Sequence, residues 1–152
     1  MFARLALETD RRAVIDLARM QVQETLPHLD FHASIAWETF DAYLASANPT
    51  FFVAEDRGNV VGYLMALMNG YAFTTGLHVV QEVLYVKPDK RGGLAAALLV
   101  KAFVAWGTRV GARELFFGIS NGFQPERTAR FFRHFGAEVV GYSLKLVPAE
   151  DT

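Results

Sequence analysis

The stretch that decides the fold is residues 80–100, VQEVLYVKPDKRGGLAAALLV. Its first residues are mostly β-branched, aromatic or aliphatic, which favours a strand. Pro88 ends that strand because proline has no N–H to donate to a neighbouring strand. From Leu94 onward, apolar residues recur at helical spacing. The pattern therefore predicts a strand, then a basic turn rich in glycine, then a helix.

The turn, residues 90–93, has the composition of an anion site. Its two glycines let the backbone bend sharply and let a ligand approach without a Cβ in the way. The first amides of the next helix lack helical partners and carry the positive end of the helix dipole. Beside Lys90 and Arg91, such a helix start suits a phosphate or a diphosphate. An ordinary strand-to-helix turn with solvated cations is the alternative, and the turn alone does not separate the two.

Two well-known phosphate motifs do not fit this turn. No Gly-Lys-Ser/Thr follows the glycines, which argues against a nucleoside triphosphate P-loop. The turn also lacks a full Gly-x-Gly-x-x-Gly and comes deep in the chain, which argues against a dinucleotide-binding Rossmann unit.

Composition limits the class of protein. The length of 152 residues fits one domain spanning residues 1–152, and 52% apolar content is typical of a folded chain. A net charge of −1 argues against binding nucleic acid through general electrostatics. Without cysteine, no disulfide, thiolate metal site or cysteine nucleophile is available, which suits a cytoplasmic protein. No stretch approaches the roughly 18 apolar residues that span a bilayer, so no membrane partner is expected.

The rest of the chain alternates strand and helix patterns. Strands are predicted at residues 2–7, 51–55, 60–68, 114–120 and 139–147, and helices at 13–26, 33–47 and 125–135. Residues 56–59 (DRGN) predict a hairpin turn, with Gly58 adopting the unusual backbone angle. Such a mixture predicts an α/β sheet covered by helices on both faces.

At this point the chain resembles a known family. The segment V-x-P-x-x-R-G, here Val86, Pro88, Arg91 and Gly92, resembles the pyrophosphate-binding turn of the GNAT N-acetyltransferases. The family pattern Gln/Arg-x-x-Gly-x-Gly/Ala maps onto residues 90–95, with Lys90 replacing its first residue. Read from Arg91 instead, the loop is one residue shorter than usual. The order of predicted elements is also that of the family, which implies a mixed, mostly antiparallel sheet of six or seven strands with helices on both faces.

The resemblance implies acetyl-CoA as co-substrate, no metal, and transfer of the acetyl group by direct thioester attack. The acceptor would be a primary amine of a small molecule or peptide. The residues that it implies for coenzyme binding lie in the central strand, the turn and the last helix: Leu84, Tyr85, Val86, Lys90, Arg91, Gly92, Gly93, Leu94, Ala95, Asn121 and Phe132. For Asn121, the alternative is a loop residue that merely starts an Asn-Gly turn. Dimers are common among similar proteins, so a homodimer is a further implication.

The attacking amine must be neutral, so the reaction needs a base. Glu82 in the central strand is the candidate, because many family members carry a glutamate near this position. A carboxylate in an apolar strand would also have its pKa raised by desolvation. Pairing of Glu82 with a cation, or exposure to solvent, is the alternative. His78 is the reserve base.

The family usually protonates the leaving thiolate from a tyrosine four residues before the glycine that ends the last long helix. Counted back from Gly136, that position is Phe132, which cannot donate a proton. Ser120, Tyr142, Tyr85 or water could replace it. This departure also keeps open a different class of function, a catalytically degenerate domain that binds CoA or a protein partner.

The acceptor pocket is expected between the two early helices and the loops after residues 27 and 69. Phe31, Trp37, Tyr71 and Phe73, together with Phe40, could form an aromatic wall there. Aromatic residues at helical spacing can equally be core residues. If the wall forms, an aromatic or apolar amine fits it better than an aminoglycoside, which needs an acidic cleft.

Overall fold

The computed structural model of the protein describes residues 1–45, 47–48, 50–118 and 124–150. The chain divides into two compact units, residues 1–118 and residues 119–152, and each is described by itself.

The first unit is built on one mixed sheet. Its strands are β1 (Phe2–Leu5), β2 (Thr50–Asp56), β3 (Asn59–Gly70), β4 (Leu77–Val86) and β5 (Glu114–Phe117), in the spatial order β1-β2-β3-β4-β5. The first four run antiparallel to their neighbours, and β5 runs parallel to β4. The predicted mixed, mostly antiparallel sheet is confirmed. The predicted number of six or seven strands is wrong, because the described residues form five.

The β2–β3 connection is the predicted hairpin. Asp56 pairs with Asn59, which leaves Arg57 and Gly58 as a two-residue loop. Their φ angles are +52° and +83°, so both lie in the left-handed region. This is the geometry of a tight hairpin turn whose twist matches that of the flanking strands.

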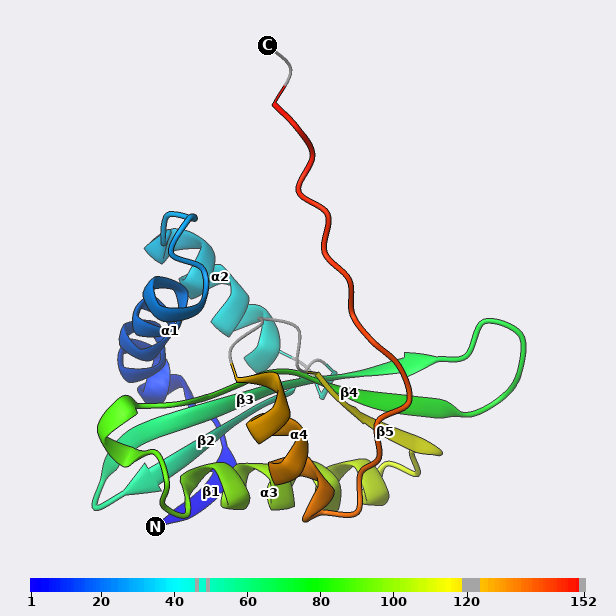
Figure 1. Ribbon diagram of the computed structural model, residues 1–152. Helices are drawn as coiled ribbons and strands as arrows, with labels where there is room; N and C mark the ends of the chain where they lie inside the picture. Colours follow the sequence, from blue (N-terminus) through cyan, green and yellow to red (C-terminus); the bar gives the residue numbers. More distant parts are fainter. Residues whose placement is uncertain (46, 49, 119–123, 151–152) are drawn as a thin grey trace. The chain divides into compact units, whose positions relative to one another are not determined.

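Helices cover both faces of this sheet (Figure 1). On one face lie α1 (Arg11–Thr25), preceded by the short η1 (Glu8–Asp10), and α2 (Ala33–Leu44). On the other lies α3 (Ala95–Arg109), which follows the short η2 (Pro88–Lys90). Because side chains alternate along a strand, Phe51 packs in the core cluster with α1 and α2 while Phe52 packs in the cluster with α3. The sheet is therefore buried on both faces.

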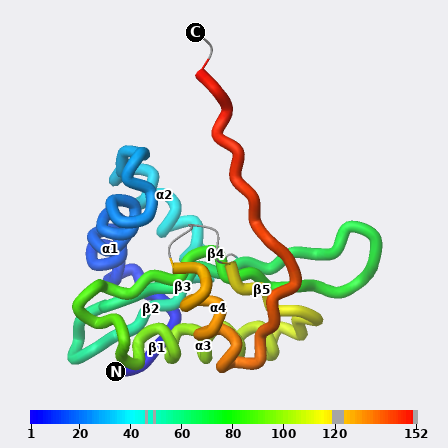
Figure 2. Tube along the Cα trace, viewed as in Figure 1, coloured from blue at the N-terminus to red at the C-terminus, as the bar shows by residue number. Residues whose placement is uncertain are grey.

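The β3–β4 hairpin continues past the end of β2, and β5 pairs along part of this extension. The pairing of β3 with β2 ends at Ala66, whereas its pairing with β4 continues as far as Gly70 and Leu77. Figure 2 traces this extension and the loop of residues 71–76 at its tip.

Helix α3 packs closely on the sheet at Gly107. A Cβ added to Gly107 would lie 2.9 Å from side-chain carbons of both Val79 and Leu115. These two residues are partners in β4 and β5. The missing side chain therefore lets α3 rest directly over the parallel pair of strands.

The second unit contains the helix α4 (Pro125–Arg133). Gly136, with a φ of +90°, follows it as the predicted stop. The strand predicted at residues 139–147 is absent, and Val140, Tyr142 and Leu144 are exposed. The alternating apolar pattern favours an extended chain, but a strand also needs the edge of another strand. The described part of this unit holds only a helix.

Candidate active site at the split between two parallel strands

Strands β4 and β5 separate after a short parallel pairing. The last paired residues are Gln81 and Phe117, and among the described residues no strand pairs with β4 on that side from Glu82 to Val86. The Gln81 side chain is only 2% exposed, and its Oε1 accepts a hydrogen bond of 3.2 Å from the Gly118 amide. This side-chain contact replaces the backbone ladder at the point where the two strands separate.

The free edge of β4 presents backbone groups at alternate residues. The Lys87 amide donates to the Val61 carbonyl at 2.8 Å, so the next opposed pair, Gly62 and Val86, is of the type without direct hydrogen bonds. The N–H and C=O of Val86 therefore point away from β3, as do those of Leu84. Both residues face the side on which β5 has separated from β4.

The start of α3 follows this edge and has no side-chain cap. Leu94 occupies the N-cap position, and the first turn contains no acidic residue. The first helical hydrogen bond runs from the Leu98 amide to the Leu94 carbonyl at 2.9 Å, so the preceding amides have no helical acceptor. Gly92, with a φ of +80°, turns the chain just ahead of them. The backbone thus has the free helix amides on which the predicted anion site depends, and anion binding itself stays a prediction.

The basic residues of the turn are paired with carboxylates of the protein. Lys90 Nζ lies 3.0 Å from Asp56 Oδ2, and Lys87 Nζ lies 4.0 Å from Asp89 Oδ1. Both lysines near this helix start therefore already have a carboxylate partner in the protein.

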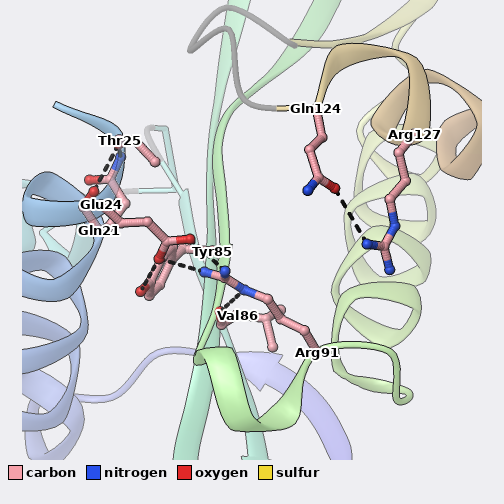
Figure 3. A network of polar contacts seen from close by, with 8 residues as sticks. All are labelled: Gln21, Glu24, Thr25, Tyr85, Val86, Arg91, Gln124 and Arg127. Carbon is pink, nitrogen blue, oxygen red and sulfur yellow. Dashed lines mark hydrogen bonds and ion pairs between the residues drawn. The ribbon is translucent and has the colours of Figure 1, made fainter.

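Arg91 joins the turn to α1 (Figure 3). Its Nη1 and Nη2 donate to the two carboxylate oxygens of Glu24 at 2.5 and 2.8 Å, and its Nε donates to the Val86 carbonyl at 2.9 Å. The Tyr85 hydroxyl donates to the same carboxylate at 3.0 Å, and the guanidinium lies 5.2 Å from the Tyr85 ring centre. Arg91 thus ties the end of β4 to the end of α1.

This cluster determines the charge states of its members. The Arg91 hydrogen bonds hold the pKa of Glu24 below its ordinary value, although burial acts in the opposite direction. Burial, followed by the bond to Glu24, raises the pKa of Tyr85 to about 12. Glu24 is therefore ionised and Tyr85 protonated near neutral pH, and the Tyr85 proton is engaged by Glu24.

Glu82 lies at a bulge in β4. Met65 pairs with Val83 and Ala66 pairs with Gln81, which leaves Glu82 without an opposed residue in β3. Its side chain is exposed, so the burial on which the sequence argument relied is absent. The Tyr43 hydroxyl from α2 donates to Glu82 Oε1. Burial, then this contact, raises the pKa of Tyr43, so Tyr43 is a permanent donor that orients the carboxylate.

The reserve base His78 lies near the start of β4, among aromatic rings. Its ring centre is 4.9 Å from that of Tyr71 and 5.5 Å from that of Phe116. Its Nδ1 is buried and has no hydrogen-bond partner among the described residues. The neighbouring Tyr71 hydroxyl donates to Glu114 at 2.5 Å.

Of the five aromatic residues predicted to form an acceptor wall, only Phe31 and Phe40 lie together. Phe31 lines a cavity of about 240 Å³ between α1, α2 and the sheet, together with Phe40. Trp37 instead packs under the Arg11 guanidinium, 4.7 Å from its ring centre. Tyr71 contacts β5, and Phe73 is fully exposed in the β3–β4 loop.

The remaining predicted site residues belong to the chain after residue 118. Ser120 and Asn121 lie outside the described residues. Phe132 is in α4 with its ring 5.4 Å from that of Phe131, and Tyr142 is exposed in the segment after that helix.

Sequence reasoning missed Glu24, Tyr43 and Gln81. Each contacts the site across a long separation, for example 67 residues between Glu24 and Arg91. Glu24 and Tyr43 lie within predicted helices, where no local pattern distinguishes them from ordinary helix residues. An arginine in a basic turn can pair with a carboxylate, but the sequence does not say which carboxylate that is.

Two absences concern the described residues. No helix among them is both long and apolar enough to cross a bilayer. No group of three or more histidine, aspartate or glutamate side chains among them is arranged to hold a metal ion.

Comparisons with known proteins agree with this geometry. The family model described as "Acetyltransferase (GNAT) family" matches residues 12–137. No curated protein sequence matches the chain significantly. Among solved structures, a transcriptional regulator from Bacillus halodurans is similar with a TM-score of 0.81 and 17% identity, over 95% of this chain and 97% of that one.

Two aminoglycoside acetyltransferases are also similar in structure. The apo 6'-N-acetyltransferase AAC(6')-IG from Acinetobacter haemolyticus has a TM-score of 0.74 and 15% identity, over 99% of this chain and all of that one. The enzyme AAC(6')-Iy, in complex with a bisubstrate analogue of CoA and acetylneamine, has a TM-score of 0.74 and 20% identity, over 97% of each chain. At these identities, the likeness establishes the fold.

Proposed function

Because this chain belongs to the acetyltransferase (GNAT) family, we propose that it is an acetyl-CoA-dependent N-acetyltransferase for a primary amine of a small molecule or peptide. The observation that carries the proposal is the free edge of β4 leading to the uncapped start of α3. Strand-like backbone groups suit the amide-containing pantetheine arm, and free helix amides suit the diphosphate. Solved structures of similar fold contain CoA or a CoA analogue, which supports this coenzyme.

Each part of the coenzyme has a proposed partner. The amides of residues 92–95 bind the diphosphate, and the outward groups of Leu84 and the Val86 amide bind the pantetheine arm. The Leu84 amide also donates to the thioester oxygen, which stabilises negative charge as it develops there. Arg91 positions the turn through Glu24 and Val86 and leaves the phosphates to the backbone.

The reaction follows from this arrangement. The lone pair of the neutral amine attacks the thioester carbonyl carbon and forms the C–N bond. The C–S bond then breaks and CoA leaves as the thiolate. Glu82 accepts the proton from the amine, directly or through one water, and later releases it to solvent or to the thiolate. Since a thiol has a pKa of about 8.5, the thiolate leaves without a dedicated acid near neutral pH.

One feature favours a second candidate function. Phe132 occupies the position at which the family resemblance expects a tyrosine. A domain that has lost turnover and binds CoA or a protein partner would tolerate this change. Thiol release from acetyl-CoA across a panel of primary amines separates the two, because measurable CoA affinity without release from any amine favours the second.

A matched pair of variants at Leu94 tests where the diphosphate binds. Leu94 is exposed at the start of α3, so Leu94→Glu and Leu94→Gln differ only in charge. A carboxylate at a helix start is compatible with folding. It repels a diphosphate, so we expect CoA affinity by calorimetry to fall at least tenfold in Leu94→Glu and less than threefold in Leu94→Gln. Equal affinities in the two variants would place the coenzyme elsewhere.

A further inference from the structure

The cavity between α1, α2 and the sheet has mainly apolar walls. Val14 and Val22 contribute from α1, Ile35 and Phe40 from α2, and Phe51 from β2. A volume of about 240 Å³ exceeds the cavity of about 150 Å³ that is known to hold benzene in another protein. It falls below the range of about 300–1,000 Å³ that is usual for drug-sized ligands. The cavity therefore matches a single aromatic ring, or a branched alkyl group of similar size.

The charged groups at the cavity are few. Among the described residues that line it, Asp30 is the only carboxylate, and no lysine or arginine is present. Negative charge at this position suits the entry of a cationic amine. The walls, however, offer few partners for a molecule with many hydroxyl groups, and burying such groups unpaired is costly. The lining thus favours an amine with one apolar group over an aminoglycoside.

The cavity lies beside the bulge that carries Glu82. Its floor includes Tyr63 and Met65 of β3, which pair with Tyr85 and Val83 of β4. Paired strands lie about 4.8 Å apart, so Val83 is one strand away from the floor, and Glu82 is its neighbour. The wall residue Phe51 also packs against the Tyr43 ring at 5.9 Å between centres, and the Tyr43 hydroxyl binds Glu82.

We propose that this cavity binds the apolar group of the acceptor, and that the acceptor is a primary amine carrying one aromatic ring or a branched alkyl group. The inference rests on the proposed N-acetyltransferase function and names its substrate class. The ring enters the cavity between α1 and α2, and a short linker brings the amine nitrogen to Glu82.

Two alanine variants on α2 test the cavity directly. Ala36 lines the cavity and is half-buried, whereas Ala42 is exposed on the same helix and does not line it. With 2-phenylethylamine as acceptor, we expect Ala36→Phe to raise the amine KM at least tenfold and to change the acetyl-CoA KM less than twofold. Ala42→Phe should change neither. Ala18→Leu, which fills the cavity from α1, repeats the test if Ala36→Phe does not fold.

A binding measurement is independent of turnover. Saturation-transfer NMR with 2-phenylethanol, which lacks the amine, should detect binding to the wild type and not to Ala36→Phe. We also expect kcat/KM for 2-phenylethylamine to exceed that for kanamycin, an aminoglycoside, by at least tenfold.

The outcomes separate the inference from the function on which it rests. Turnover that prefers kanamycin, or an amine KM that Ala36→Phe leaves unchanged, overturns the inference and leaves an N-acetyltransferase. No thiol release with any amine overturns the proposed function and the acceptor assignment together. Binding of 2-phenylethanol in that case identifies the cavity as a site for an apolar ligand of a non-catalytic domain.

Discussion

At the scale of single residues, the bulge in β4 explains how a carboxylate becomes available at the site. A regular strand would alternate Gln81, Glu82 and Val83 between the two faces. Because Glu82 has no opposed residue in β3, the alternation is interrupted, and Tyr43 reaches the carboxylate from α2. The exposed carboxylate can therefore receive a proton from a bound amine and return it to solvent.

Replacing this carboxylate by an amide tests its role as the base. We expect Glu82→Gln to lower kcat about 100-fold, the lower limit for loss of a general base, because the amide accepts no proton. Affinity for acetyl-CoA should change less than threefold. Tyr43→Phe, which removes only the orienting hydroxyl, should also lower kcat, but by a smaller factor. A Glu82→Gln enzyme with wild-type kcat at every pH would exclude Glu82 as the base.

The role of Arg91 leads to a prediction about its partner. If Arg91 bound the diphosphate, Glu24→Gln would release the guanidinium and strengthen coenzyme binding. Because Arg91 instead ties Val86 and the turn to α1, we expect Glu24→Gln to raise the acetyl-CoA KM several-fold with little change in kcat. Glu38→Gln, at an exposed carboxylate of α2, is the matched control and should leave both constants unchanged. A lowered acetyl-CoA KM in Glu24→Gln would instead indicate that Arg91 binds the diphosphate.

At the scale of elements, α3 has two functions. Its start supplies amides, and its later turns hold β4 and β5 together just before they separate. The close contact depends on Gly107, which is buried against Val79 and Leu115. Any side chain there would push the helix away from the parallel pair.

Adding one methyl group at Gly107 tests this packing. Alanine favours a helix by about 1 kcal/mol over glycine, so an unhindered site would be stabilised. Here the new Cβ would lie 2.9 Å from two side chains, and overpacking usually costs about 1–3 kcal/mol. We therefore expect Gly107→Ala to lower the free energy of unfolding in urea by up to about 2 kcal/mol. Ala105→Gly, on the exposed face of the same helix, measures the difference in helix propensity without a change in packing. A Gly107→Ala protein more stable than wild type would disprove the close packing.

The elements predicted from the sequence formed where the local pattern was sufficient. The hairpin at residues 56–59, the central strand and the helix after Leu94 each carry their own signal in turn residues or periodicity. The strand predicted at residues 139–147 failed because pairing depends on a partner that no local pattern supplies. The bulge at Glu82 could not be predicted for the same reason, because a bulge is defined by the pairing of β4 with β3.

The candidate site could likewise be predicted only where its signal was local in the sequence. The turn at residues 90–95 was recognisable because glycines and a helix start lie next to each other in sequence. The contacts of Glu24 with Arg91 and of Tyr43 with Glu82 join distant segments, and they depend on how α1 and α2 pack on the sheet.

At the scale of the whole molecule, the first unit is held at its N-terminal end by a partly buried charge cluster. Arg4 donates to both oxygens of Asp10 at 2.7 and 3.0 Å and to Glu55 at 2.9 Å, so it links β1, η1 and β2. The Leu7 amide also donates to Asp10 at 2.8 Å. Burial alone would raise the pKa of Asp10, but these hydrogen bonds outweigh it and lower the pKa below its ordinary value.

A lowered carboxylate pKa makes stability depend on pH with a definite sign. In the unfolded chain, Asp10 and Glu24 bind protons near their ordinary pKa values of 3.8 and 4.5, whereas in the folded chain they do so only at lower pH. The unfolded state therefore binds more protons across this interval, and acid favours it. The stabilisation is complete above about pH 5 and declines as the pH falls through the folded pKa values.

Removing the Asp10 charge tests this account by urea unfolding between pH 3 and pH 7. Because hydrogen bonds to charged groups contribute roughly 1.5–3 kcal/mol, we expect Asp10→Asn to be less stable than wild type by about 2 kcal/mol at pH 7. The difference should narrow below pH 4, since Asp10 of the unfolded wild type then binds a proton and its charge stabilises the folded state less. Asp16→Asn, at an exposed carboxylate 3.9 Å from Arg19, should have the same free energy of unfolding as wild type at every pH. A constant difference between Asp10→Asn and wild type down to pH 3 would mean that Asp10 stabilises the fold through shape and neutral hydrogen bonds, and that the acid sensitivity of this unit has another source.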